Sequence, residues 1–298
     1  MAKATVYFSR DISPEKVVTM YKALGIALPG KVAVKVHSGE KGNQNFLRPE
    51  FWQPMVEEVK GTIVECNTAY GDKFGNGVRD YTEQHRELIA YHGWSKVFDV
   101  DLMDAEGPDV IWQIPDGKIL KENHLGKNIM NYDSMLVLAH FKGHPMGGYG
   151  GALKQLSIGC ASREGKALIH SGGRSASNHE AWDVHADRCA FPEAMADAAA
   201  SVVRHFEGKI AFINVMKNLS VDCDCCSPAE DPCMKDIGIL ASLDPVAIDQ
   251  ACIDLIYSSD DPGRDHFIKR VESRNGIHTI EAAAALGYGS REYELIEI

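Results

Sequence analysis

The sequence of 298 residues lacks an apolar run long enough for a signal peptide or a membrane-spanning helix. We therefore expect a cytoplasmic protein without a membrane partner. The sequence also lacks a lysine- and arginine-rich run, since 31 basic residues face 42 acidic ones and the formal net charge is −11. Nucleic-acid binding depends on such basic clusters, so we expect no nucleic-acid partner.

Cysteines are few but unevenly spaced. Four of the eight lie within residues 223–233, in the segment CDCCSPAEDPC. This segment contains neither the paired spacing of structural zinc sites nor the repeated C-x2-C spacing of ferredoxins. In a reducing cytosol, close cysteines favour metal or redox chemistry over disulfides. We expect Cys223 and Cys225 to hold an iron or zinc ion, or a small iron–sulfur cluster, with one or two further ligands.

The remaining isolated cysteines and two histidines call for simpler interpretations. His85 and His92 are seven residues apart on one predicted helix, about 10.5 Å along its axis, which is too far to share an ion. We expect them to be surface or packing residues. A lone cysteine is usually a small buried apolar group, and this interpretation is given to Cys66, Cys160, Cys189 and Cys252.

Short β-rich segments alternate with helical ones along the chain. The apolar segment SMLVLAH (134–140) is typical of a strand buried on both faces of a parallel sheet. Ser13–Pro14 and Asp244–Pro245 have the pattern of a helix N-cap followed by proline at the first helical position. We predict one α/β domain over residues 1–298, with a mainly parallel sheet covered by helices on both faces and an undetermined strand order. Residues 163–190 are polar and aperiodic, which predicts an irregular loop.

Chemically versatile residues follow the predicted strands. His37 and Glu40 come after the strand at 31–37, and Asn67 ends the strand at 61–67. The apolar strand ends in the segment that contains His140, Lys142 and His144, and the strand at 209–215 leads to the cysteine cluster. Ligands of parallel sheets bind outside the carboxyl ends of the strands, so we expect one site there. Loops also begin at strand ends, but this explains three histidines and a cysteine cluster less well. His140 and His144 are thus the candidate additional metal ligands.

A glycine-rich segment, GHPMGGYGGALKQL (143–156), suggests an anion site. Glycines allow close backbone approach, and a helix that begins there offers N–H groups to an anion, with Lys154 in its first turns. The segment matches neither the nucleotide phosphate loop nor the dinucleotide fingerprint. A sharp turn with a solvated lysine is the alternative. The candidate ligand-binding residues are Asn67, Lys142, Gly147, Gly148, Gly150 and Gly151.

Several segments together resemble one family across nearly the whole chain. They are KVHSGEKGN (35–43), NTAYG (67–71), HFKGHPMGGYGGALKQLSIGCASREGK (140–166), VDCDC (221–225), DIGILASLDPVAIDQACIDLI (236–256) and LGYGSREYELIEI (286–298). They are similar to the uncharacterised proteins of domain-of-unknown-function family 362, often labelled iron–sulfur-centre proteins. The resemblance implies a shared site at His37, Glu40, Asn67, His140, Lys142, His144, Lys154, Asp222, Cys223 and Cys225.

The chain departs from many members of this family in one region. Those members carry a ferredoxin-like insert with two cysteine-rich motifs after the CASREGK segment. Between Lys166 and Phe191 this chain has a single cysteine, Cys189, so no 4Fe–4S ferredoxin module can be built there. Cys226 and Cys233 lie outside the family pattern and are additions of this sequence.

Three hypotheses about function follow. In the first, the protein is a metal-dependent, redox-linked enzyme: the cysteine pair and a histidine hold the metal, Lys154 and the glycine-rich segment bind a small anionic substrate, and His37 or Glu40 acts as acid or base. A separate electron donor would then replace the missing insert. In the second, the protein binds a ligand or a metallocentre without catalysis. In the third, it is a structural or interaction protein whose cysteines hold no metal.

Overall fold

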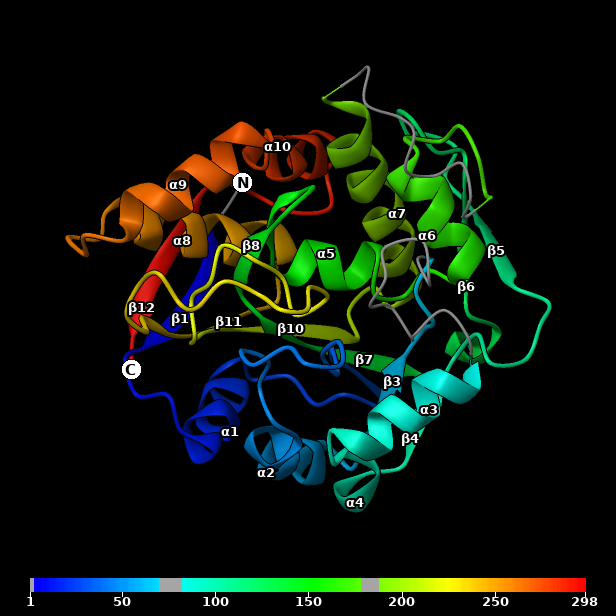
Figure 1. The fold of residues 1–298 in the computed structure, drawn as a ribbon, viewed down its shortest axis with the longest axis horizontal. Helices are drawn as coiled ribbons and strands as arrows, with labels where there is room; N and C mark the ends of the chain where they lie inside the picture. Colours follow the sequence, from blue (N-terminus) through cyan, green and yellow to red (C-terminus); the bar gives the residue numbers. More distant parts are fainter. Residues whose placement is uncertain (1–2, 70–81, 178–187) are drawn as a thin grey trace.

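A twisted sheet of eight strands forms the centre of the molecule. The computed structural model describes residues 3–69, 82–177 and 188–298. The strand order is β12-β1-β11-β10-β7-β2-β3-β4 (Figure 1). Within the described sheet, β11 alone runs antiparallel to its neighbours β1 and β10. The strands of this sheet are β1 (Ala4–Ser9), β2 (Val32–Lys35), β3 (Thr62–Glu65), β4 (Val100–Leu102), β7 (Ser134–His140), β10 (Ile210–Met216), β11 (Gly238–Ser242) and β12 (Tyr293–Glu297).

Helices cover both faces of this sheet (Figure 1). One layer consists of α1 (Pro14–Ala23), α2 (Pro49–Val59), α3 (Thr82–Tyr91) and α4 (Trp94–Val97). The opposite layer consists of α5 (Ala152–Ser157), α7 (Ala190–His205), α8 (Pro245–Tyr257), α9 (Arg264–Ser273) and α10 (Ile277–Ala285), with α6 (Arg163–His170) at its edge. Two antiparallel pairs lie outside the large sheet: β5 (Val110–Gln113) with β6 (Glu122–Leu125), and β8 (Lys142–His144) with β9 (Gly148–Gly150). A 3-10 helix spans Lys127–Asn131.

Strand β7 shows how the two cores arise from one apolar segment. Met135 and Val137 belong to the core under α5 and α7–α10, whereas Leu136 and Leu138 belong to the core under α1–α4. Successive side chains of a strand point to opposite faces, so a strand between two helix layers must be apolar at every position. Both β7 and β10 are buried along their whole length. The prediction of an α/β fold with a mainly parallel, doubly covered sheet is confirmed.

The two helix starts are also as predicted. The Ser13 hydroxyl accepts a hydrogen bond from the backbone N–H of Lys16, with Pro14 at the first helical position. The Asp244 carboxylate accepts from the N–H groups of Val246 and Ala247, at 2.8 and 2.9 Å. These side chains satisfy N–H groups that would otherwise have no partner inside the helix.

The expectation of an irregular loop over residues 163–190 is wrong for its first part, which forms α6. Ser162 caps this helix by accepting a hydrogen bond from the backbone N–H of Gly165. Gly165 lowers the helical propensity of the segment, but it is required by packing, because a Cβ at this position would overlap the carbonyl oxygen of His124. The local sequence pattern therefore did not predict this helix. Residues 178–187 of the expected loop lie outside the described residues.

Among the described residues, no helix is both long enough and apolar enough to cross a bilayer.

Candidate functional site

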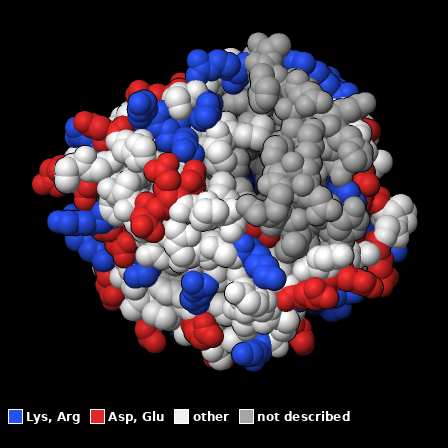
Figure 2. Space-filling model, viewed as in Figure 1, with Lys and Arg blue, Asp and Glu red and all other residues white. Residues whose placement is uncertain are grey.

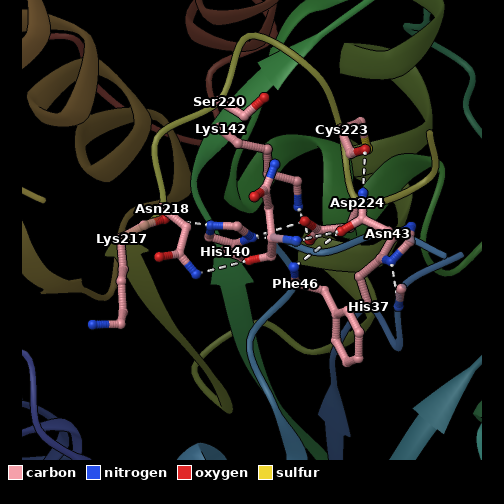
Figure 3. Close-up of polar contacts among 12 residues, drawn as sticks. His37, Asn43, Phe46, His140, Lys142, Lys217, Asn218, Ser220, Cys223 and Asp224 are labelled. Atoms are coloured by element: carbon pink, nitrogen blue, oxygen red, sulfur yellow. Dashed lines mark hydrogen bonds and ion pairs between the residues drawn. The ribbon is translucent and has the colours of Figure 1, made fainter. Parts of the chain in front are cut away.

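A buried carboxylate, Asp224, organises the region beyond the carboxyl ends of β2 and β7. Its Oδ1 lies 2.9 Å from Nδ1 of His140, the last residue of β7, and its Oδ2 lies 2.8 Å from Nζ of Lys142 (Figure 3). Its carbonyl oxygen accepts a hydrogen bond from the backbone N–H of Glu40 at 2.7 Å. Burial alone would raise the pKa of Asp224, but His140 and Lys142 together hold it well below its usual range. The side chain is therefore an ionised carboxylate at neutral pH.

Further hydrogen bonds fix the cysteine-containing segment in place. The side-chain amide of Asn43 donates to the carbonyl oxygens of Cys223 and Cys226, at 3.2 and 2.8 Å. The backbone N–H of Gly143 donates a hydrogen bond to the carbonyl oxygen of Ser220. A Cβ at position 143 would overlap the backbone of Val221, so this close approach requires glycine. Segment 220–226 is thus held between the β8–β9 hairpin and the loop that follows β2.

This arrangement brings Cys223, Cys225 and His144 together. Their sulfur and ring-nitrogen atoms all lie within 4.8 Å of one another. Cys225 Sγ is 3.8 Å from His144 Nε2, and Lys154 Nζ is 4.0 Å from Cys223 Sγ. Two thiolates and an imidazole are ligands suited to zinc or iron. Three protein donors also leave a coordination position for water or substrate, as in catalytic zinc sites.

Both cysteines are thiols in the metal-free protein at neutral pH. Burial raises the pKa of Cys223 to about 11. The contact with Cys223 lowers the pKa of Cys225, but its contact with Cys226 and its burial outweigh this effect and raise the value to about 12. A metal ion must therefore displace two thiol protons. The ammonium groups of Lys142 and Lys154 favour this step, since both lower the pKa of Cys223.

The hydrogen bonds of His144 define its protonation state. Its Nδ1 accepts from the backbone N–H groups of Met146 and Gly147, at 3.2 and 2.8 Å. Burial, and then the charge of Lys154, lower the pKa of His144 to about 4, so the ring is neutral at pH 7. The proton therefore resides on Nε2, which faces the Cys225 sulfur. A metal-bound histidine normally donates a hydrogen bond through its other ring nitrogen, so the cysteine pair fits the role of ligand more directly than His144 does.

His140, the other expected histidine ligand, does not belong to this group. Its Nδ1 lies against the Asp224 carboxylate and its Nε2 against the carbonyl oxygen of Lys217. Both ring nitrogens thus face oxygen acceptors, and the side chain is buried. His140 supports the site by anchoring Asp224 rather than by facing the sulfur atoms.

The Cys225 side chain opens onto a cavity of about 520 Å³. Its described lining includes four lysines, Lys35, Lys142, Lys154 and Lys166, but three carboxylates, Glu40, Glu65 and Asp222. His37, His144, His170, Gly150 and Gly151 also contribute to the wall. The lining is therefore richer in cations than the chain as a whole, whose net charge is −11. On the outer face shown in Figure 2, by contrast, acidic and basic side chains are interspersed.

The glycine-rich segment does not leave a free helix start for an external anion, contrary to the expectation. The N–H groups of Ala152 and Leu153, at the start of α5, donate to the carboxylate of Asp249 at 2.8 and 3.0 Å. A Cβ on Gly151 would overlap this carboxylate. The helix start predicted to receive an external anion is thus filled by an internal one. Gly150 and Gly151 do reach the cavity, whereas Gly147 and Gly148 do not occur among its described lining residues.

Asn67 is also absent from the described lining of the cavity, although its neighbours Cys66 and Thr68 belong to it. Its side-chain amide N–H donates to Thr82 Oγ1 at 2.9 Å, and its Oδ1 accepts a hydrogen bond from His85 Nδ1 at 3.0 Å. The other ring nitrogen of His85 is 3.0 Å from Glu65 Oε2. His92 stacks on Phe46, with ring centroids 4.4 Å apart. Both helix histidines are therefore packing residues, in line with the prediction.

Five residues of the site were not predicted from the sequence: Lys35, Glu65, Lys166 and His170, which line the cavity, and Asp224, which anchors the cysteine segment. Lys35 is the one charged residue of β2 and is 2% exposed, so a lysine inside an apolar strand was an available signal. Burial lowers its pKa to about 8. Lys166 lies in α6, within the segment that was predicted to be a loop. Asp224 pairs with His140 across 84 positions, and no local pattern indicates such a contact.

Replacing Asp224 by asparagine should destabilise the protein by about 3–5 kcal/mol, because the Lys142 ammonium would stay buried without its counter-charge. The pKa of Asp224 is lower in the folded protein than in the unfolded chain. Its contribution is therefore present above about pH 4 and is lost as the pH falls further. Urea unfolding from pH 3 to 7 should show this slope in the wild type and a weaker one in the variant. Glu297→Gln, which removes an exposed pair with Arg10, should cost less than about 1 kcal/mol. Equal losses would contradict this assignment.

Comparison with known proteins assigns the chain to a family. A search of curated proteins finds no match. The solved structure of the lactate racemase apoprotein from Thermoanaerobacterium thermosaccharolyticum is 15% identical, with a TM-score of 0.40, over 70% of this chain and 50% of that protein. A crystal structure of a Thermotoga maritima protein is 9% identical, with a TM-score of 0.41, over 92% of this chain and 59% of that one. The model of the family described as "Domain of unknown function (DUF362)" matches residues 32–254. The chain therefore belongs to the DUF362 family, as its sequence segments indicate.

Proposed function

We propose that the protein is a metal-dependent enzyme that binds a small anionic substrate in the lysine-lined cavity, next to an ion held by Cys223 and Cys225. One observation carries this proposal: two members of the group, Cys225 and His144, border the cavity, whereas Cys223 is buried beside them. A purely structural metal site is normally closed by four protein ligands. Here a metal bound by the cysteine pair would have an open side toward the cavity.

The identity of the metal decides the class of reaction. Thiolate ligands suit both iron and zinc. A bound ion would supply Lewis-acid polarisation of the substrate or, as iron, a centre for electron transfer. We propose the redox-linked version for iron, with a separate protein or small molecule as electron donor, because the chain has a single cysteine between Lys166 and Phe191.

Side chains around the cavity would provide charge balance, anion binding and acid–base catalysis. Lys142 is paired with Asp224 at 2.8 Å, so its charge mainly balances that carboxylate and the nearby thiolates. Lys154, which is 4.0 Å from Cys223 Sγ, borders the same cavity and would attract the anionic part of a substrate. His37 and Glu40 also border the cavity and are the proposed acid and base. Lys35, whose pKa burial lowers to about 8, is a further candidate base.

Metal analysis of two double variants tests the metal part of the proposal. Protein purified without oxygen and without a metal-binding tag should contain a metal ion, and Cys223→Ser/Cys225→Ser should contain one equivalent less per chain. Cys226→Ser/Cys233→Ser is the matched control and should retain the wild-type content. An equal loss in both double variants would refute the assignment of the ligands. A wild-type protein without metal would refute the proposal itself.

Anion binding can be tested separately, with inorganic phosphate and malonate as probes in calorimetric titrations. Lys154→Gln should weaken binding by roughly 10- to 100-fold, because it removes one charge-assisted hydrogen bond worth about 1.5–3 kcal/mol. Lys96→Gln, an exposed change on α4, should leave the affinity unchanged. Equal affinities of Lys154→Gln and the wild type, or no binding of either probe to the wild type, would contradict the proposed role.

A further inference from the structure

A second group of metal-binding side chains lies where the starts of α7 and α10 meet. Cys189 precedes α7, Glu193 lies in the first turn of α7, and His278 lies in the first turn of α10. One ligand atom from each residue falls within 4.8 Å of the others. These three residues do not occur among the described residues that line the cavity. We propose that this group is a second metal site, with a donor set suited to zinc, which links α7 to α10.

The donor set supports zinc. Thiolate, imidazole and carboxylate are its usual protein ligands, and three of them with one water molecule complete a tetrahedron. Glu193 is nearly buried, with a side chain 5% exposed, so its carboxylate is held in place. The side-chain amide of Asn275 lies 3.5 Å from Cys189 Sγ and would stabilise a thiolate there.

The surroundings of His278 match those of a metal-bound histidine. Its Nε2 lies 2.8 Å from Glu193 Oε1, and its Nδ1 lies 3.2 Å from Glu281 Oε2. When zinc replaces the proton on Nε2, the Nδ1 proton can still donate to Glu281. This is the carboxylate–histidine–metal arrangement that orients such ligands. It is the reverse of His144, whose second ring nitrogen accepts hydrogen bonds.

One cation competes with the metal for the site. Lys118 Nζ is 2.6 Å from Glu193 Oε1, but the lysine side chain is 70% exposed. It can turn into solvent at little cost when an ion takes its place. Zinc would take the place of the proton on His278 Nε2 and would bind the Cys189 sulfur as a thiolate. The charge at Glu193 would then be balanced by the metal instead of by Lys118 and His278.

Cobalt(II) titration tests this site independently of the proposed function. In the Cys223→Ser/Cys225→Ser background, one equivalent of cobalt should produce the charge-transfer absorption of a cobalt–thiolate bond. Adding Cys189→Ser or His278→Gln to this background should abolish that absorption, whereas adding Cys233→Ser should not. Retention of the absorption after Cys189→Ser, or its absence from the background protein, would overturn the proposal.

Two further measurements separate a metal site from an ion-pair network and from loss of folding. Glu281→Gln should weaken zinc binding by roughly 10- to 100-fold, as expected for the removal of a carboxylate that orients a ligand. Glu294→Gln, an exposed glutamate in β12, should have no effect. Excess zinc should raise the unfolding temperature of the wild type, and Cys189→Ser should lose part of that increase. A wild-type increase that Cys189→Ser retains in full would contradict the proposal.

Discussion

The structure depends on the pairing of one buried carboxylate, Asp224, with His140 and Lys142. An ionised group in the interior is tolerated only when opposite charges and hydrogen bonds compensate its loss of hydration. His140 lies at the end of the central strand β7, and Lys142 lies in the hairpin beyond it. The Asp224 carboxylate can therefore contact both partners only at this position. Because Cys223 and Cys225 flank Asp224 in the chain, fixing the carboxylate also fixes the two sulfur atoms. The CDC sequence is thus an anchor with a potential ligand on either side.

Internal groups fill the positions at which an external anion was expected. Asp249 occupies the backbone N–H groups at the start of α5, and His144 occupies two more in the turn before β9. The glycines permit these close internal contacts. Under the proposed function, attraction of an anion would fall to the lysine side chains around the cavity, of which Lys35 and Lys166 are almost fully buried. Buried cations interact strongly with an incoming anion because water screens them less.

The sequence was most informative where the controlling interactions are local or periodic. The apolar segment 134–140 predicted a doubly covered strand, and Asp244–Pro245 predicted the start of α8. Convergence of His37, Glu40, Lys142, His144, Lys154 and Cys225 on one cavity followed from the rule that the carboxyl ends of parallel strands share an edge. The remaining features depend on contacts between distant segments. The partners of His140 lie far away in the sequence, so its role as an anchor of Asp224 was not predicted. The contact that requires a glycine at position 165 also has no local signature, so helix α6 was not predicted.

The Cys223 and Cys225 sulfur atoms are the proposed ligands of a metal at the edge of the cavity. X-ray absorption fine structure, measured at the absorption edge of the metal that copurifies with the protein, would identify the ligand atoms. The Cys189→Ser variant should be used, so that sulfur from the second proposed site does not contribute. We predict two sulfur neighbours per metal, at about 2.3 Å if the metal is zinc. A first shell made of nitrogen and oxygen alone would show that neither cysteine binds the metal.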